Sequence, residues 1–164
     1  MKLRNIVPLL AVASMGWTAS HPAFADTLKQ KKEVIEGSAV CEYFMLKDMN
    51  HAIEEYKKNH NRSTLDGAFG LFMIATTWNL LALDEGASQS EIDRSMDMLN
   101  REGLPQSHKD ARECANDAGN ALKSMPDAQA KRYFDASAAE FRNLSRKDHF
   151  EIPVGFFDQK HPKH

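Results

Sequence analysis

The sequence lacks the motifs by which most enzymes and metalloproteins are recognised. Its 164 residues contain no G-x-S-x-G or S-x-x-K nucleophile motif and no H-E-x-x-H zinc motif. The two cysteines, Cys41 and Cys114, form neither a C-x-x-C pair nor the C-x-x-C-H site that attaches c-type haem. No catalytic, cofactor-binding or metal-binding residues are therefore predicted, and a non-enzymatic role is favoured over catalysis.

The sequence also lacks an excess of either charge. It has 21 Lys and Arg against 23 Asp and Glu, and its formal net charge is −2. Binding to nucleic acid needs a clustered basic surface, and attraction to anionic lipid needs a polybasic segment. Nucleic acid is therefore not a predicted partner, and no internal repeat or low-complexity segment points to another class.

What the sequence does have is an N-terminal segment typical of a secretory signal peptide. Lys2 and Arg4 precede an uncharged, largely apolar stretch over residues 6–17. Ala23-Phe24-Ala25 then supplies the small-x-small pattern that signal peptidase cleaves. Cleavage at this point would leave Asp26 as the new amino terminus.

Removal of residues 1–25 predicts a periplasmic or secreted protein of bacterial type. The mature chain would carry 19 basic and 23 acidic residues, a net charge of −4. The alternative is an uncleaved membrane anchor, for which about 20 apolar residues are needed. Pro8 and Gly16 interrupt the apolar stretch over residues 6–20, so cleavage is the favoured interpretation.

An exported chain with two cysteines is expected to form one disulfide, between Cys41 and Cys114. Closing a loop of that length stabilises a fold by about 4 kcal/mol in the chain-entropy model. A catalytic thiol or a metal-binding pair is the alternative, but no C-x-x-C spacing or second cysteine pair supports it.

Periodicity predicts an all-α, single-domain bundle of about five helices over residues 26–148. A long helix is expected over residues 27–60, where Gly37 is a candidate kink, and a second over residues 65–83. Three more are expected after a Ser88–Glu91 capping box, after a Ser107 cap, and from Pro126 to about Asp148. The list of expected helices is: 27–60, 65–83, 89–102, 108–125 and 126–148.

The second expected helix is unusual because residues 67–83 carry no charge and are apolar around the whole helix axis. Such a helix lies either in the centre of a bundle or in a membrane. Seventeen residues rise about 25 Å, which is short of a hydrocarbon core of about 30 Å. The central-core interpretation is therefore favoured, and no stable membrane span is predicted after signal cleavage.

Residues 149–164 end the chain with a different pattern. Apolar residues alternate with other types, which is typical of an extended segment with one apolar face. Pro153 argues against a central strand. The segment either completes the core or forms a partner-binding strip, since exposed apolar patches mark interaction sites. The candidate partner-binding residues are Phe150, Ile152, Val154, Phe156 and Phe157.

Histidine and acidic residues also meet on one face of the first expected helix. His51 lies one turn from Asp48, Glu54 and Glu55, which is the minimum for a metal pair or an oriented base. A solvated helix face is the favoured interpretation, because the spacing matches no specific motif. His161 and His164 could bind a metal weakly, although a polar tail is expected there.

A signal peptide, five helices and one long-range disulfide together resemble several periplasmic helical modules. Among these are immunity proteins that neutralise a secreted effector, and small stress chaperones. The resemblance covers architecture only. The absence of catalytic motifs in a disulfide-linked, well-capped scaffold favours a protein-binding module, such as an inhibitor or immunity protein, whose partner is another exported protein.

Two alternative functions stay open. An acid-responsive chaperone is suggested by the apolar second helix and by six of the seven histidines following residue 25. A small helical hydrolase would use Asp48, His51 and Glu55. Both need evidence beyond fold class, since fold does not imply function.

Overall fold

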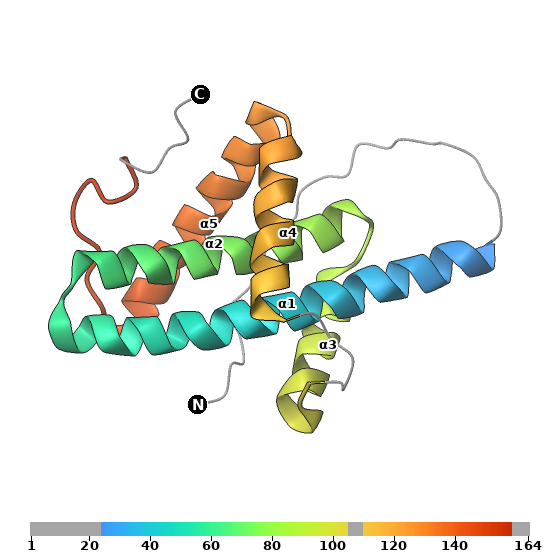
Figure 1. The fold of residues 1–164 in the computed structure, drawn as a ribbon, viewed down its shortest axis with the longest axis horizontal. Helices are drawn as coiled ribbons and strands as arrows, with labels where there is room; N and C mark the ends of the chain where they lie inside the picture. The colour runs from blue at the N-terminus through green and yellow to red at the C-terminus, as the bar shows by residue number, and fades with distance from the viewer. Residues whose placement is uncertain (1–23, 105–109, 159–164) are drawn as a thin grey trace.

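The computed structural model describes residues 24–104 and 110–158, and over these ranges it is a bundle of five helices without strands. The predicted all-α bundle is confirmed (Figure 1). The predicted signal peptide lies outside the described residues, apart from its last two positions. The helices are α1 (Phe24–Asn59), α2 (Arg62–Asp84), α3 (Gln89–Glu102), α4 (Ala111–Ser124) and α5 (Asp127–Asp148).

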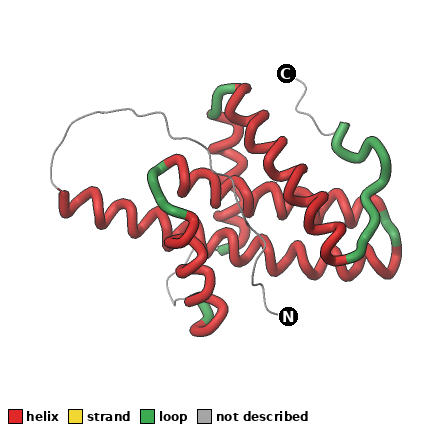
Figure 2. Tube along the Cα trace, turned by 180° about the vertical axis from the view of Figure 1, so that it is seen from behind, coloured by secondary structure: helices red, strands yellow, loops and turns green. Residues whose placement is uncertain are grey.

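Helices α1 and α2 form an antiparallel hairpin that organises the fold (Figure 1). α1 continues through Gly37, so the candidate kink does not divide the helix. The chain reverses at His60, whose φ is 52°, and Asn61 then caps α2 by accepting a hydrogen bond from Ser63 N at 2.9 Å. The N-terminal end of α1 projects beyond the other helices (Figures 1 and 2).

Helix α2 is the central helix, since it packs against each of the other four. It is also long and apolar enough to cross a membrane by length and composition. In the bundle, its buried residues face the neighbouring helices, as expected for the core helix predicted from residues 67–83. These buried residues are Leu65, Ala68, Phe69, Phe72, Ala75, Thr77, Asn79 and Ala82.

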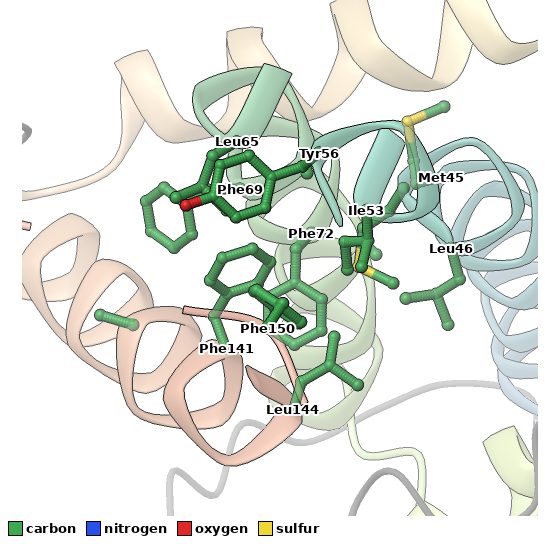
Figure 3. Close-up of a cluster of buried hydrophobic side chains, with 14 of the residues drawn as sticks. Met45, Leu46, Ile53, Tyr56, Leu65, Phe69, Phe72, Phe141, Leu144 and Phe150 are labelled. Carbon is green, nitrogen blue, oxygen red and sulfur yellow. The ribbon is translucent and has the colours of Figure 1, made fainter. Parts of the chain in front are cut away.

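The main core joins α1, α2, α5 and the segment that follows α5 (Figure 3). Phe69 of α2 lies at its centre, with its ring edge-to-face against Phe134 at 5.8 Å and Phe141 at 5.3 Å. Edge-to-face pairs contribute about 0.5–1.5 kcal/mol beyond the burial of their area. The aromatic residues therefore hold α5 against the hairpin.

Helix α4 crosses the hairpin and is joined to α1 by the predicted disulfide (Figure 1). The Cα atoms of Cys41 and Cys114 are 5.3 Å apart, and both residues are fully buried. Trp78 of α2 adds a hydrogen bond from its Nε1 to the Cys114 carbonyl oxygen at 3.1 Å. The covalent bond and this hydrogen bond fix α4 to both helices of the hairpin.

The helix starts follow local capping signals, with one correction. The Ser88–Glu91 capping box begins α3 as predicted. α4 does not begin from Ser107, which lies outside the described residues, because Asp110 is its N-cap. The Asp110 carboxylate accepts from Glu113 N at 2.8 Å and the Glu113 carboxylate accepts from Asp110 N at 3.0 Å. A second capping box thus begins the helix three residues later.

A polar cluster at the end of α2 fixes the orientation of α5. The Tyr133 hydroxyl donates to Asp84 Oδ2 at 2.6 Å, and Arg132 Nη2 contacts the same oxygen at 2.8 Å. Gln129 adds a third donor to this carboxylate at 3.1 Å. Pro126 takes the N-cap position of α5, immediately before the helix rather than inside its first turn.

Candidate functional site

The segment after α5 is anchored in the core by three of its aromatic residues. Phe150, Phe156 and Phe157 are at most 7% exposed. The Phe156 and Phe157 rings lie 5.8 and 5.0 Å from the ring of Phe69. The Tyr56 hydroxyl of α1 donates to the Glu151 carbonyl oxygen at 2.9 Å, which ties the backbone to the hairpin as well.

Residues 153–158, which include the anchors Phe156 and Phe157, form what we call the C-terminal turn (Figure 2). Phe156 N donates to the Pro153 carbonyl at 3.1 Å, and Gly155 adopts a φ of 74° that favours glycine. The predicted alternation along one extended face therefore breaks at Gly155. Val154 is left fully exposed and Ile152 half-buried, whereas the aromatic residues turn inward.

Beside the turn lies an open concavity of about 380 Å³. Two arginines from the last turns of α5 line it. The Arg142 guanidinium lies 4.3 Å from the centroid of the Phe157 ring, a cation–π contact, and Arg146 donates to Asn143 Oδ1. The lining residues are Arg142, Ser145, Arg146, Ile152, Pro153, Val154, Gly155, Phe156, Phe157 and Asp158.

This arrangement combines an exposed apolar side chain with positive charge. Arg142 and Arg146 outnumber Asp158, so the rim of the concavity carries a formal charge of +1. Guanidinium groups bind carboxylates through paired hydrogen bonds. The surface is therefore complementary to a partner surface that places a carboxylate beside an apolar group.

The predicted histidine face of α1 does not assemble into a site. His51 and Asp48 are exposed, and the nearby acids pair with lysines instead. Lys58 donates to Glu55 at 2.9 Å and thereby lowers the pKa of that carboxyl. No group of three potential ligands that could hold a metal ion occurs among the described residues. His161 and His164 lie outside the described ranges.

A second polar feature is buried where α1, α2 and α3 meet. Glu42 is 7% exposed and accepts a hydrogen bond from Asn79 Nδ2 at 3.2 Å. The pKa of Glu42 is raised to about 7, mainly by burial; the Asn79 hydrogen bond opposes this shift, and the charge of Asp93 on α3 adds to it. We call Glu42, Asn79 and Asp93 the Glu42 junction.

Sequence reasoning missed the Glu42 junction, although the sequence contains a signal for it. Glu42 is the one charged residue in the stretch 37–46, which otherwise reads as an apolar helix surface. A lone acid in such a stretch is either exposed on the opposite face or buried with a partner. Its partner comes from α2, 37 residues away, so local spacing did not identify it.

No family model, curated protein or solved structure matches this chain. Its function is therefore inferred from its own surfaces. Of the five predicted partner-binding residues, Val154 and Ile152 reach the surface and the three phenylalanines hold the segment in place. The sequence did not single out Arg142 and Arg146, because they are two of many charges on α5.

Proposed function

We propose that this protein is an exported, non-enzymatic protein-binding module, such as an inhibitor or immunity protein for a secreted effector. One observation carries the proposal: the C-terminal turn presents a fully exposed Val154 beside Arg142 and Arg146, on a segment anchored by core aromatics. The disulfide independently supports an oxidising compartment, and the predicted signal peptide makes the periplasm the proposed location.

The anchoring of the turn favours binding for an energetic reason. A flexible segment loses conformational entropy when it binds, whereas a segment already held by Phe156 and Phe157 loses little. Arginine is also enriched at protein interfaces and among the residues that dominate their binding energy. A turn fixed in this way supports tight binding despite its small size.

The proposed partner is another exported protein with an apolar pocket for Val154. We expect that pocket to be flanked by Asp or Glu, because the rim of the concavity carries a net positive charge. The mature chain is acidic as a whole, so this local positive charge would orient the partner toward the C-terminal turn.

A capture experiment with a matched control tests the proposal. Val154 and Met98 are the large hydrophobic residues exposed among the described residues, and Met98 lies on α3. The mature protein and its Val154→Asp and Met98→Asp variants would be immobilised and exposed to exported proteins of the source organism. We expect one stoichiometric partner that wild type and Met98→Asp retain and that Val154→Asp binds at least tenfold more weakly.

The same experiment defines failure. Absence of a stoichiometric partner, together with an unchanged phenotype when the gene is deleted, would argue against a binding module. A partner that Val154→Asp binds as tightly as wild type would leave the protein-binding role standing but move it away from the C-terminal turn. An Arg146→Gln variant, with Arg94→Gln on α3 as control, then tests the expected carboxylate contact.

A further inference from the structure

The Glu42 junction buries a carboxyl group beside a neutral hydrogen-bond donor and near a second acid. Glu42 lies on α1, and its hydrogen-bond donor, Asn79 of α2, is a neutral amide. The charge of α3 that acts on Glu42 is that of Asp93, an exposed residue with the same charge as an ionised Glu42. Buried charges in proteins are normally paired with an opposite charge, so the protonated form is the one that this environment suits.

Helix α3 packs beside this region of α1 and buries few of its own residues. Only Ile92 and Leu99 of its 14 residues are buried. They pack on Ile35 and Val40 of α1, within two turns of Glu42. A half-buried ion pair between Lys31 and Glu91, at 3.2 Å, adds a polar contact between the same helices. Such a pair contributes little to stability.

A glycine with a positive φ lies close to each end of α3. Gly86 precedes the helix with a φ of 90°, and Gly103 follows it with a φ of 81°. The disulfide joins α1 to α4 and so does not restrain α3. The buried residues of the main core come from outside α3, and the partly buried Met96 is the residue of α3 that packs against it.

We propose that the Glu42 junction is a proton-controlled switch: protonated Glu42 permits α3 to pack on α1, and ionised Glu42 favours a state in which α3 is displaced and the carboxylate is hydrated. The displaced state exposes the apolar surface of α1 around Ile35, Ala39 and Val40. The switch goes beyond the protein-binding role and does not depend on it.

The difference between the two pKa values of Glu42, in the packed and in the displaced state, sets the direction of the switch and the pH range in which it operates. The folded-state pKa of Glu42, about 7, lies above the ordinary value of 4.5 that a hydrated carboxyl has. The packed state is therefore favoured fully below pH 4.5, and this advantage is lost as the pH rises to 7. The equilibrium constant for displacement of α3 then rises by about tenfold per pH unit in that interval, and by on the order of 50-fold between pH 5 and pH 8.

This switch would operate in the opposite sense to the acid-responsive chaperone hypothesis. That hypothesis requires protonation of histidines to loosen the fold. The described histidines, His51, His60 and His149, are all exposed, so none of them lies in the core. Displacement of α3 at alkaline pH and not at acid pH separates the two ideas.

Amide hydrogen exchange of the full mature protein, with its disulfide intact, tests the switch. Exchange would be followed at pH 5 and pH 8 and corrected for the intrinsic pH dependence of amide exchange. The variants are Glu42→Gln and, as a control on the same helix, the exposed Glu36→Gln. We expect the opening constant of Gln89–Glu102 to rise on the order of 50-fold in wild type and in Glu36→Gln, and to stay constant in Glu42→Gln.

Three results would overturn the switch. The first is equal protection of α3 at the two pH values. The second is the same rise of the opening constant in Glu42→Gln as in wild type. The third is an equal rise of the opening constant in all five helices, which would mean that the whole fold loosens. If Glu42→Gln does not fold, Asp93→Asn replaces it. Removing that like charge lowers the pKa of Glu42, so the rise from pH 5 to pH 8 should become smaller, and an unchanged rise overturns the proposal.

Discussion

Replacing both members of the Cys41–Cys114 disulfide with alanine should cost about 4 kcal/mol of folding free energy. The bond closes a loop with a sequence separation of 73 residues, and the chain-entropy model gives this value for a loop of that length. Alanine is preferred to serine because both cysteines are fully buried, and a serine hydroxyl there would need a hydrogen-bond partner. Since domains of this size are stable by about 5–15 kcal/mol, the loss would be a large fraction of the total.

Urea unfolding followed by circular dichroism measures the effect. Wild type and the Cys41→Ala/Cys114→Ala variant would be compared at one pH, with the unfolding free energy extrapolated to water. Because α4 buries little beyond Cys114 and Ala118, its amides should lose protection first in the variant. Wild type reduced in denaturant and refolded under reducing conditions is the control, and it should be as unstable as the variant.

Two outcomes would refute this reasoning. A loss below about 1 kcal/mol would show that the unfolded chain is not constrained as the entropy model requires. A difference that persists between the variant and reduced wild type would show that lost packing at the two sulfur positions, and not the covalent link, determines stability.

Two further predictions concern the core. Phe69→Ala removes the ring that contacts both α5 and the C-terminal turn, and it should lower the free energy of unfolding by about 3–5 kcal/mol. Limited proteolysis should accelerate more near residue 150 than elsewhere. Equal acceleration along the whole chain would contradict the anchoring role of Phe69. Tyr133→Phe removes the 2.6 Å hydrogen bond to Asp84 and should lower the free energy of unfolding by about 1–2 kcal/mol, as measured by thermal unfolding. The loss stays this small because Arg132 and Gln129 still donate to Asp84. An unchanged Tm would show that these remaining donors replace the hydroxyl.

Much of the helical architecture could be predicted because its signals are local. The Ser88–Glu91 box and the uncharged run of residues 67–83 each depend on neighbours in sequence. The start of α4 was harder, because Ser107 and Asp110 each precede an acidic residue by three positions. Two capping boxes compete there, and local pattern does not choose between them.

The C-terminal segment shows where pattern reasoning reaches its limit. Alternation predicted one apolar face containing Val154 and the phenylalanines together. The positive φ of Gly155 instead separates them, with Phe156 and Phe157 in the core and Val154 in solvent. Hydrophobicity identified the apolar residues of the segment but not where each side chain points. That depends on the turn at Gly155 and on the core that α2 and α5 supply.

By itself, the sequence determined the helices, the pairing of the two cysteines and the choice of residues 67–83 as the central helix, because each follows from periodicity, composition or count. Only the tertiary structure decided that Val154 is displayed beside Arg142, and that Glu42 is buried against Asn79 and near Asp93. These features arise from groups far apart in the sequence. Burial and electrostatic environment are properties of packed segments, and the burial that raises the pKa of Glu42 exists only in the folded bundle.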